Sequence, residues 1–283
     1  MKKVILSISV MLCTMAGFAQ NNDSQLTQTG HDNETTVWQK GWDNTSDVTQ
    51  GGYMNNSDVK QVGVKLDATI SQLGKKNDAN IDQSGYNHSA SITQTAGSSD
   101  NVATIEQCGG YKKAPKLDCP TCDNQPGGGG HHDDDKQINR NGHDDDDHHG
   151  GGHDTHGNGS GSVASIEQSG HNNTATLDQC DSGSVGDIIQ DGCDNTATIT
   201  QNDDHGKNNA ASITQNGESN DGSITQNGHD NVADISQTGC FNKSDITQAG
   251  HDNTAMSLQT GYGQMSDISQ NGWNLTATVT QRN

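Results

Sequence analysis

Asn195-Thr-Ala-Thr-Ile-Thr-Gln201 is one copy of a short unit that recurs along this chain, and its glutamine sets the period. Gln occurs every eleven residues through residues 28–94, 168–201 and 215–281. A fixed period of this length is typical of stacked supersecondary units rather than of one globular core. We count 19 units, 8 before a central insert and 11 after it.

Three positions in each unit have a constant character. The residue four before Gln is small, and the residue two before Gln is Val, Ile or Leu except at Ser257. A spacing of two is the side-chain period of a β-strand, so these residues and Gln point to one face, while the intervening Thr, Ser, Asp and Glu face water. The same period and the β-branched residues disfavour an amphipathic helix.

Turn residues separate the expected strands, with Gly often two after Gln and Asn five after it. Gly supplies positive φ, and Asn tolerates the left-handed region and bonds its own backbone. Strand and turn repeated twice make a coil of about 22 residues, and stacked coils lie about 4.8 Å apart in parallel register. The sequence therefore predicts an all-β, parallel β-solenoid with two strands per coil.

The inward Gln side chains are expected to stack as an amide ladder along the axis. We assign to it Gln28, Gln50, Gln72, Gln94, Gln179, Gln201, Gln226, Gln248 and Gln270.

Composition alone would indicate disorder, with 27% hydrophobic residues, 3% aromatic residues and a net charge of −21. The 11-residue period outweighs this composition, because a narrow solenoid needs only two or three inward residues per strand. The acidity and the lack of a basic stripe argue against nucleic-acid binding.

Residues 1–19 have the basic start and apolar core of a secretory signal, with cleavage expected before Gln20. A lipoprotein signal at Cys13 is disfavoured because Leu12 stands where a small residue is needed. No later segment approaches the roughly 20 apolar residues of a transmembrane span. The expected organisation is repeats at 20–107, an insert at 108–161 and repeats at 162–283.

The pattern Gln226-Asn-Gly-His-Asp-Asn-Val-Ala-Asp-Ile-Ser-Gln237 resembles the curlin repeat of curli subunits. The resemblance covers about residues 28–107 and 162–281, with Leu66 and Leu275 in place of the turn Asn. It implies a secreted functional amyloid subunit of a bacterial biofilm matrix. The implied partners are an outer-membrane secretion pore and a nucleator subunit at the cell surface.

Self-association is also expected on physical grounds. The first expected strand begins at Ser24 and the last ends at Gln281, with no capping element beside either. Uncovered edge strands recruit further chains, so we expect a homopolymeric, extracellular fibre. The alternative is a soluble secreted solenoid that acts as an adhesin or binds metal. An ice-binding solenoid would need a regular Thr-x-Thr face, which Asp residues interrupt here.

No enzyme is expected, because Ser, His and Asp lie in repeat columns or low-complexity sequence and imply no single pocket. The insert is expected to be a disordered loop, and no cofactor is required. Its imidazoles and carboxylates suit Zn, Cu, Ni or, for Asp alone, Ca. The alternative is a solvated acidic tether. The candidate ligands are His131, His132, Asp133, His143, Asp144, His148, His149 and His153.

Six Cys would remain after cleavage, in a compartment that permits disulfides. Cys108 and Cys180 each follow a unit Gln and should lie about 4.8 Å apart on adjacent coils once the insert is looped out, within disulfide range. Cys193 and Cys240 are two coils apart and are poor partners. Cys119-Pro-Thr-Cys122 fits a local disulfide or a zinc knuckle better than a redox pair.

Large rings recur three residues after Gln, at the turn tips. On one edge His229, His251 and Trp273 should stack in consecutive coils. Such a row would bind carbohydrate or metal, or make association sensitive to pH near 6. The plain alternative is that turn tips tolerate large polar rings.

Overall fold

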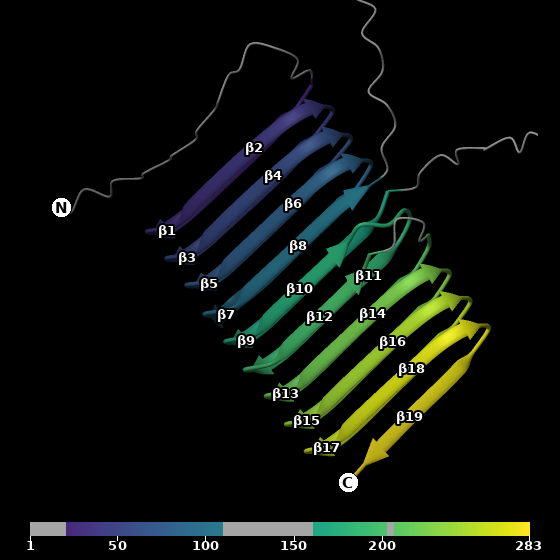
Figure 1. The fold of residues 1–283 in the computed structure, drawn as a ribbon. Helices are drawn as coiled ribbons and strands as arrows, with labels where there is room; N and C mark the ends of the chain where they lie inside the picture. The colour runs from purple at the N-terminus through teal and green to yellow at the C-terminus, as the bar shows by residue number, and fades with distance from the viewer. Residues whose placement is uncertain (1–20, 110–160, 203–206) are drawn as a thin grey trace, which may run out of the picture. The chain divides into compact units, whose positions relative to one another are not determined.

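A computed structural model describes residues 21–109, 161–202 and 207–283. In these ranges, 19 strands alternate between two parallel sheets, and no helix is present. The odd-numbered strands form a ten-stranded sheet, here the odd sheet, and the even-numbered strands form the nine-stranded even sheet (Figure 1). Each coil thus gives one strand to each sheet, and the prediction of a two-strand parallel β-solenoid is confirmed.

The odd sheet contains β1 (Asp23–His31), β3 (Thr45–Tyr53), β5 (Asp67–Lys75), β7 (Ser89–Ser99), β9 (Val163–His171), β11 (Val185–Cys193), β13 (Ala210–Glu218), β15 (Val232–Cys240), β17 (Thr254–Tyr262) and β19 (Thr276–Arg282). The even sheet contains β2 (Glu34–Trp42), β4 (Asn56–Val64), β6 (Asp78–Tyr86), β8 (Val102–Gly109), β10 (Thr174–Gln179), β12 (Thr196–Gln201), β14 (Asp221–His229), β16 (Lys243–His251) and β18 (Met265–Trp273).

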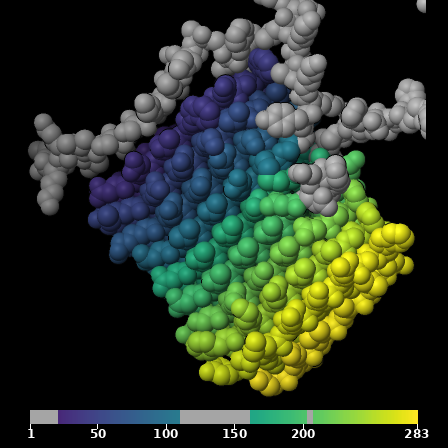
Figure 2. Space-filling model, viewed as in Figure 1, coloured from purple at the N-terminus to yellow at the C-terminus, as the bar shows by residue number. Residues whose placement is uncertain are grey.

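Strands pair in register with the strand two places along the chain. Gln28 lies beside Gln50, and Ile224 lies beside Ile246, so residues 22 apart become neighbours. The register continues across residues 110–160, because β7 pairs with β9 and β8 pairs with β10. Figure 2 shows the successive strands as parallel bands from purple to yellow. The repeats on both sides of the insert therefore form one stack.

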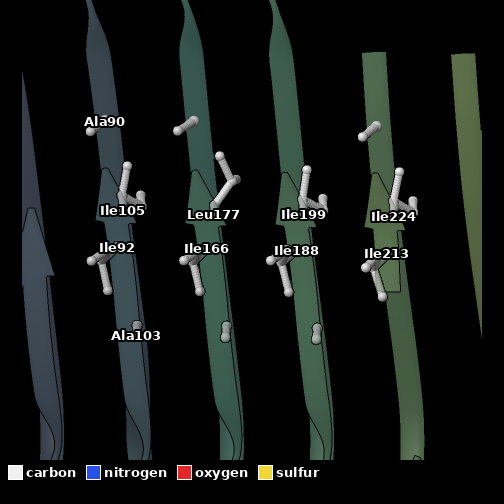
Figure 3. Close-up of a cluster of buried hydrophobic side chains, with 14 of the residues drawn as sticks. Ala90, Ile92, Ala103, Ile105, Ile166, Leu177, Ile188, Ile199, Ile213 and Ile224 are labelled. Carbon is white, nitrogen blue, oxygen red and sulfur yellow. The ribbon is translucent and has the colours of Figure 1, made fainter. Parts of the chain in front are cut away.

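The core is a double row of aliphatic side chains between the two sheets. Ile92, Ile166, Ile188 and Ile213 stack along the odd sheet, opposite the even-sheet row of Ile105, Leu177, Ile199 and Ile224 (Figure 3). These eight side chains are at most 1% exposed, and burying one such side chain contributes roughly 1.5–3 kcal/mol. The small residues of the column, such as Ala103 and Ala197, fill the space beside them. A thin core suffices because every coil repeats it.

The turns differ in detail from the sequence-based expectation. Most strands run past Gly to the third residue after Gln, so the turn between them shrinks to two residues, whereas β10 and β12 end at Gln. The left-handed residue is the one before Asn, as at Asp43 (φ 55°) before Asn44 and Phe241 (φ 59°) before Asn242. The turn Asn does not take the left-handed conformation itself, but its side chain does bond nearby backbone, as where Nδ2 of Asn55 donates to the backbone oxygen of Gly51 at 3.1 Å. Asn is instead needed for its side chain, which points inward.

Candidate functional site in the amide ladders and end strands

Two rows of buried Gln side chains run along the stack, one in each sheet. In the odd sheet, Nε2 of Gln50 donates to Oε1 of Gln72 at 2.8 Å, and Nε2 of Gln72 donates to Oε1 of Gln94 at 2.9 Å. In the even sheet, Nε2 of Gln226 donates to Oε1 of Gln248 at 2.9 Å. Each of these bonds points from one coil to the next one along the chain, so each ladder has a direction.

The second N–H of the same amide ties the two sheets together. Nε2 of Gln50 also donates to the backbone oxygen of Glu34 at 2.9 Å, and Nε2 of Gln226 to that of Ala210 at 3.0 Å. Both acceptors lie in the opposite sheet, 16 residues earlier. A buried amide with both donors satisfied is stable, whereas an orphaned buried polar group costs about 1–3 kcal/mol. The Gln column therefore fixes both register and coil closure.

The nine Gln residues assigned from the sequence to one ladder belong to two. Gln28, Gln50, Gln72 and Gln94 lie in the odd sheet, and Gln94 donates to Gln168. Gln179, Gln201, Gln226, Gln248 and Gln270 lie in the even sheet and follow Gln107. The assignment was wrong at the insert because Gln107 and Gln168 end consecutive units, which alternate between sheets. If the units that end at Gln107 and Gln168 are counted as consecutive, each later Gln is assigned to its correct sheet.

A second buried amide row comes from the turn Asn, which the sequence reading did not place in the interior. Oδ1 of Asn231 accepts from the backbone N of Asn253 at 3.2 Å, and Nδ2 of Asn231 donates to the backbone oxygen of Gly250 at 3.0 Å. These side chains are at most 1% exposed. They supply hydrogen bonds to backbone groups of the following coil, so they join successive turns. The recurrence of Asn five residues after Gln in most units was the available signal.

The Gly column is required by close stacking of backbones. A Cβ atom on Gly239 would collide with the carbonyl oxygen of Gly261, and one on Gly228 would collide with that of Gly250. These glycines also have positive φ, 116° at Gly239 and 117° at Gly228. Both the conformation and the spacing of the coils therefore exclude a larger residue.

The two ends of the insert meet at a covalent and a hydrogen-bonded contact. Cys108 and Cys180 form a disulfide with a Cα–Cα distance of 4.4 Å. In the turn between β6 and β7, Nδ1 of His88 accepts from the backbone N of Ser162 at 3.2 Å, and Nε2 of His88 lies 3.3 Å from the backbone oxygen of Gly109. Burial lowers the pKa of His88, which its backbone hydrogen bonds partly offset. Because Nδ1 of His88 accepts a hydrogen bond, that nitrogen carries no proton in this arrangement. The local signal in the sequence is that His88 stands where most units have the turn Asn.

The rings of His229, His251 and Trp273 lie beside one another in consecutive coils, as the strand register predicts. The His229 and His251 rings stack with centroids 4.8 Å apart, and the Trp273 ring lies 6.2 Å from that of His251. On the odd sheet, Cys193 and Cys240 both flank Glu218 and are unpaired thiols. Two coil spacings therefore separate these thiols, as expected.

The outer faces carry isolated charges. Lys60 forms an ion pair with Asp82, and Lys243 with Asp221 at 2.9 Å, each joining neighbouring coils. Burial raises the pKa of Asp187 and of Asp234, and burial followed by the charge of Asp82 raises that of Asp58. The Lys60–Asp82 and Lys243–Asp221 ion pairs are exposed, so they contribute little to stability.

The candidate metal ligands lie outside the described residues. They are His131, His132, Asp133, His143, Asp144, His148, His149 and His153. Cys119 and Cys122, and the expected signal at 1–19, also lie outside them. Among residues 21–109, 161–202 and 207–283, no group of three or more His, Cys, Asp or Glu is arranged to hold a metal. The same part of the chain contains no helix suited to cross a membrane.

The end coils are less protected than the interior of the stack. Ser24 in β1 is exposed, whereas the equivalent Ser46 in β3 is 3% exposed. The inward Leu26 of β1 and Val279 of β19 are only partly buried. The ladders are directional here too: Nε2 of Gln28 donates into the stack to Gln50 at 2.7 Å, and Oε1 of Gln281 accepts from Gln259 at 2.9 Å. The first coil therefore presents Oε1 outward, and the last presents Nε2.

Comparison with known protein families agrees with this geometry. The Curlin associated repeat matches residues 19–52, 41–74, 55–85, 74–109, 206–239 and 217–250. These matches fall on both sides of the insert and together cover just under half of the chain. No curated protein matches the sequence. With the 11-residue period, the alternating sheets and these six matches, the chain belongs to the curlin-repeat family.

Proposed function

We propose that this protein is the structural subunit of an extracellular functional amyloid, a curli-like fibre that serves biofilm matrix and adhesion. The subunit is secreted and grows into a homopolymer by end-to-end stacking of solenoids at the cell surface. An outer-membrane secretion apparatus and a nucleator subunit are its expected partners. Its working residues are the repeated inward columns, so the role is structural rather than catalytic.

The observation that carries this proposal is the directional ladder. The Gln28 end offers an acceptor and the Gln281 end offers a donor, beside unpaired strand edges and partly buried core residues. A second copy of the same chain matches all three features at once. Edge strands that present such groups are templates for further strand addition.

The experiment uses the mature chain, residues 20–283, incubated at neutral pH and followed by thioflavin fluorescence and electron microscopy. We expect a lag, a rise in fluorescence and unbranched fibres. Added fibre fragments should remove the lag, because their ends already present complete coils. A chain that stays monomeric through long incubation, with and without fragments, would contradict the proposal and favour a soluble adhesin.

We further propose that the insert captures divalent metal through its His and Asp residues. Thirteen His and a net charge of −21 give the chain many imidazole and carboxylate ligands for Zn, Cu, Ni or Ca. Calorimetry of the full mature chain should show heat of Zn binding that disappears when the eight candidate ligands are replaced by Asn and Ser. Equal heats for the two chains would leave the insert as an acidic tether.

A further inference from the structure

The first and last strands of the described residues lie in the same sheet. β1 and β19 are the terminal strands of the odd sheet, whereas β2 and β18 terminate the even sheet. Because strands alternate between sheets, the next strand position after β19 is in the even sheet, beside β18. A second copy in the same orientation as the first would place its own β1 in the odd sheet, beside β19, and the position beside β18 would stay empty.

The two sheets are chemically equivalent, which permits another arrangement. Each carries the same columns of small residue, aliphatic residue, Gln and Gly in the same register. A half-turn about the stack axis with an advance of one strand therefore places odd-sheet residues on even-sheet positions. β1 of a second copy is thus suited to either sheet.

We propose that consecutive subunits join head to tail with a half-turn between them, so that β1 of the next copy pairs with β18 and its β2 pairs with β19. This inference rests on the proposed fibre function and specifies its junction. Both sheets then continue without a missing strand. In a fibre, successive subunits present their odd sheets on alternate sides.

The half-turn matches the side chains of the two ends. Nε2 of Gln270, which in the chain donates to Thr254, meets Oε1 of Gln28 of the next copy. Gln281 meets Gln39 of the next copy in the same way, and Leu26 of the next copy covers Ile268. Gly272 meets Gly30; a Cβ on Gly272 would approach only Leu275 at 3.5 Å within its own chain, so that surface is open to a following backbone.

The arrangement without a half-turn leaves a gap. β1 of the next copy would pair with β19, but its β2 would lie two strand spacings, about 9.6 Å, from β18. The edge of β18 and the amide of Gln270 would then remain unpaired at a buried position, and buried polar groups without a partner destabilise such a junction. One contact opposes the half-turn, since it brings Arg282 beside Lys40 of the next copy. Both side chains sit at the exposed rim, where salt screens such repulsion.

Disulfide trapping distinguishes the two junctions. Thr27 in β1, Ser269 in β18 and Thr280 in β19 each directly precede a ladder Gln and are exposed. Thr27→Cys with Ser269→Cys joins copies only across a half-turn, and Thr27→Cys with Thr280→Cys joins them only without one. The Cys108–Cys180 bond shows that register-matched residues of neighbouring coils accept this linkage. Cys119, Cys122, Cys193 and Cys240 are replaced by Ser in both variants.

Fibres of each variant are oxidised, dissolved in denaturant and run on a non-reducing gel. We expect a ladder of covalent oligomers, reaching tenfold or more above background, for the Thr27–Ser269 pair alone. Oligomers for the Thr27–Thr280 pair alone, or for neither pair although microscopy shows fibres, would overturn the half-turn and leave the fibre function intact. Absence of fibres from the unsubstituted chain would overturn both.

Discussion

The Nε2 atom of Gln94 lies 3.0 Å from the Oε1 atom of Gln168, although 74 residues separate them in the chain. On the other sheet, Gln107 and Gln179 make the equivalent contact at 3.0 Å. Both ladders therefore continue from one side of residues 110–160 to the other without a break. An intact ladder through the middle of the chain is what an uninterrupted fibre axis requires.

Removing one interior ladder amide should weaken the whole stack. Gln226 accepts from Gln201 at 2.8 Å and donates to Gln248 at 2.9 Å, so Gln226→Leu orphans a donor and an acceptor. We expect a loss of about 2–4 kcal/mol in unfolding free energy, measured by urea denaturation. Gln25→Leu, at an exposed outward position in β1, is the matched control and should change it by less than about 0.5 kcal/mol. Equal effects would show that the ladder does not stabilise the stack.

The Gly column should tolerate no side chain where coils touch. Gly239→Ala places a methyl group against the carbonyl oxygen of Gly261, so neighbouring coils must separate. We expect at least about 2 kcal/mol of destabilisation and slower fibre growth. Gly263→Asn is the control, because Gly263 has φ 64° and no atom within 4 Å of its added Cβ, and Asn accepts that conformation. A stable Gly239→Ala chain would contradict the stacking described.

His88 should make the stack weaken on mild acidification. Its pKa is lowered by burial, so the folded state binds fewer protons than the unfolded state, and stability falls as pH drops below the ordinary value of 6.5. Protonation would also remove the Nδ1 acceptor for Ser162. Urea midpoints at pH 7 and pH 5.5 should therefore differ more for the natural chain than for His88→Asn, which restores the turn amide. Identical pH slopes would exclude this role for His88.

The disulfide at the insert should be a large single contribution to stability. Cys108 and Cys180 are 72 residues apart in sequence, and closing a loop of that length reduces the entropy of the unfolded chain by the equivalent of about 4 kcal/mol. Replacing both by Ser should lower the unfolding free energy by up to that amount. Replacing Cys193 and Cys240, which are unpaired, should leave it nearly unchanged. If the urea midpoint did not change when Cys108 and Cys180 are both replaced by Ser, strand pairing alone would hold β8 and β10 together at the insert.

Much of the fold was accessible from the sequence because the repeat is strict. The small residue, the aliphatic residue and Gln are each two residues apart, which predicted the strands, and the 11-residue period predicted the coil. Cys108 and Cys180 lie where the coil spacing places them. The direction of the Asn side chains was not accessible in the same way. A turn Asn satisfies local rules either by adopting the left-handed conformation or by facing inward, and only the lengths of the strands decide between them.

The site was partly predictable for a related reason. The Gln residues were identified, but their division between two ladders depends on counting units through an insert that lacks the repeat. His88 was missed because its role arises from contacts with Ser162 and Gly109, which are distant from each other in sequence. Such contacts follow from the register and not from any local motif.

X-ray diffraction from aligned fibres of the mature chain tests the central claim most directly. Coils stacked in register along the fibre axis predict a strong meridional reflection at about 4.8 Å and an equatorial reflection near 10 Å from the two facing sheets. Solutions in which the chain stays unassembled, or fibres whose strands run along the axis and give no meridional 4.8 Å reflection, would contradict it.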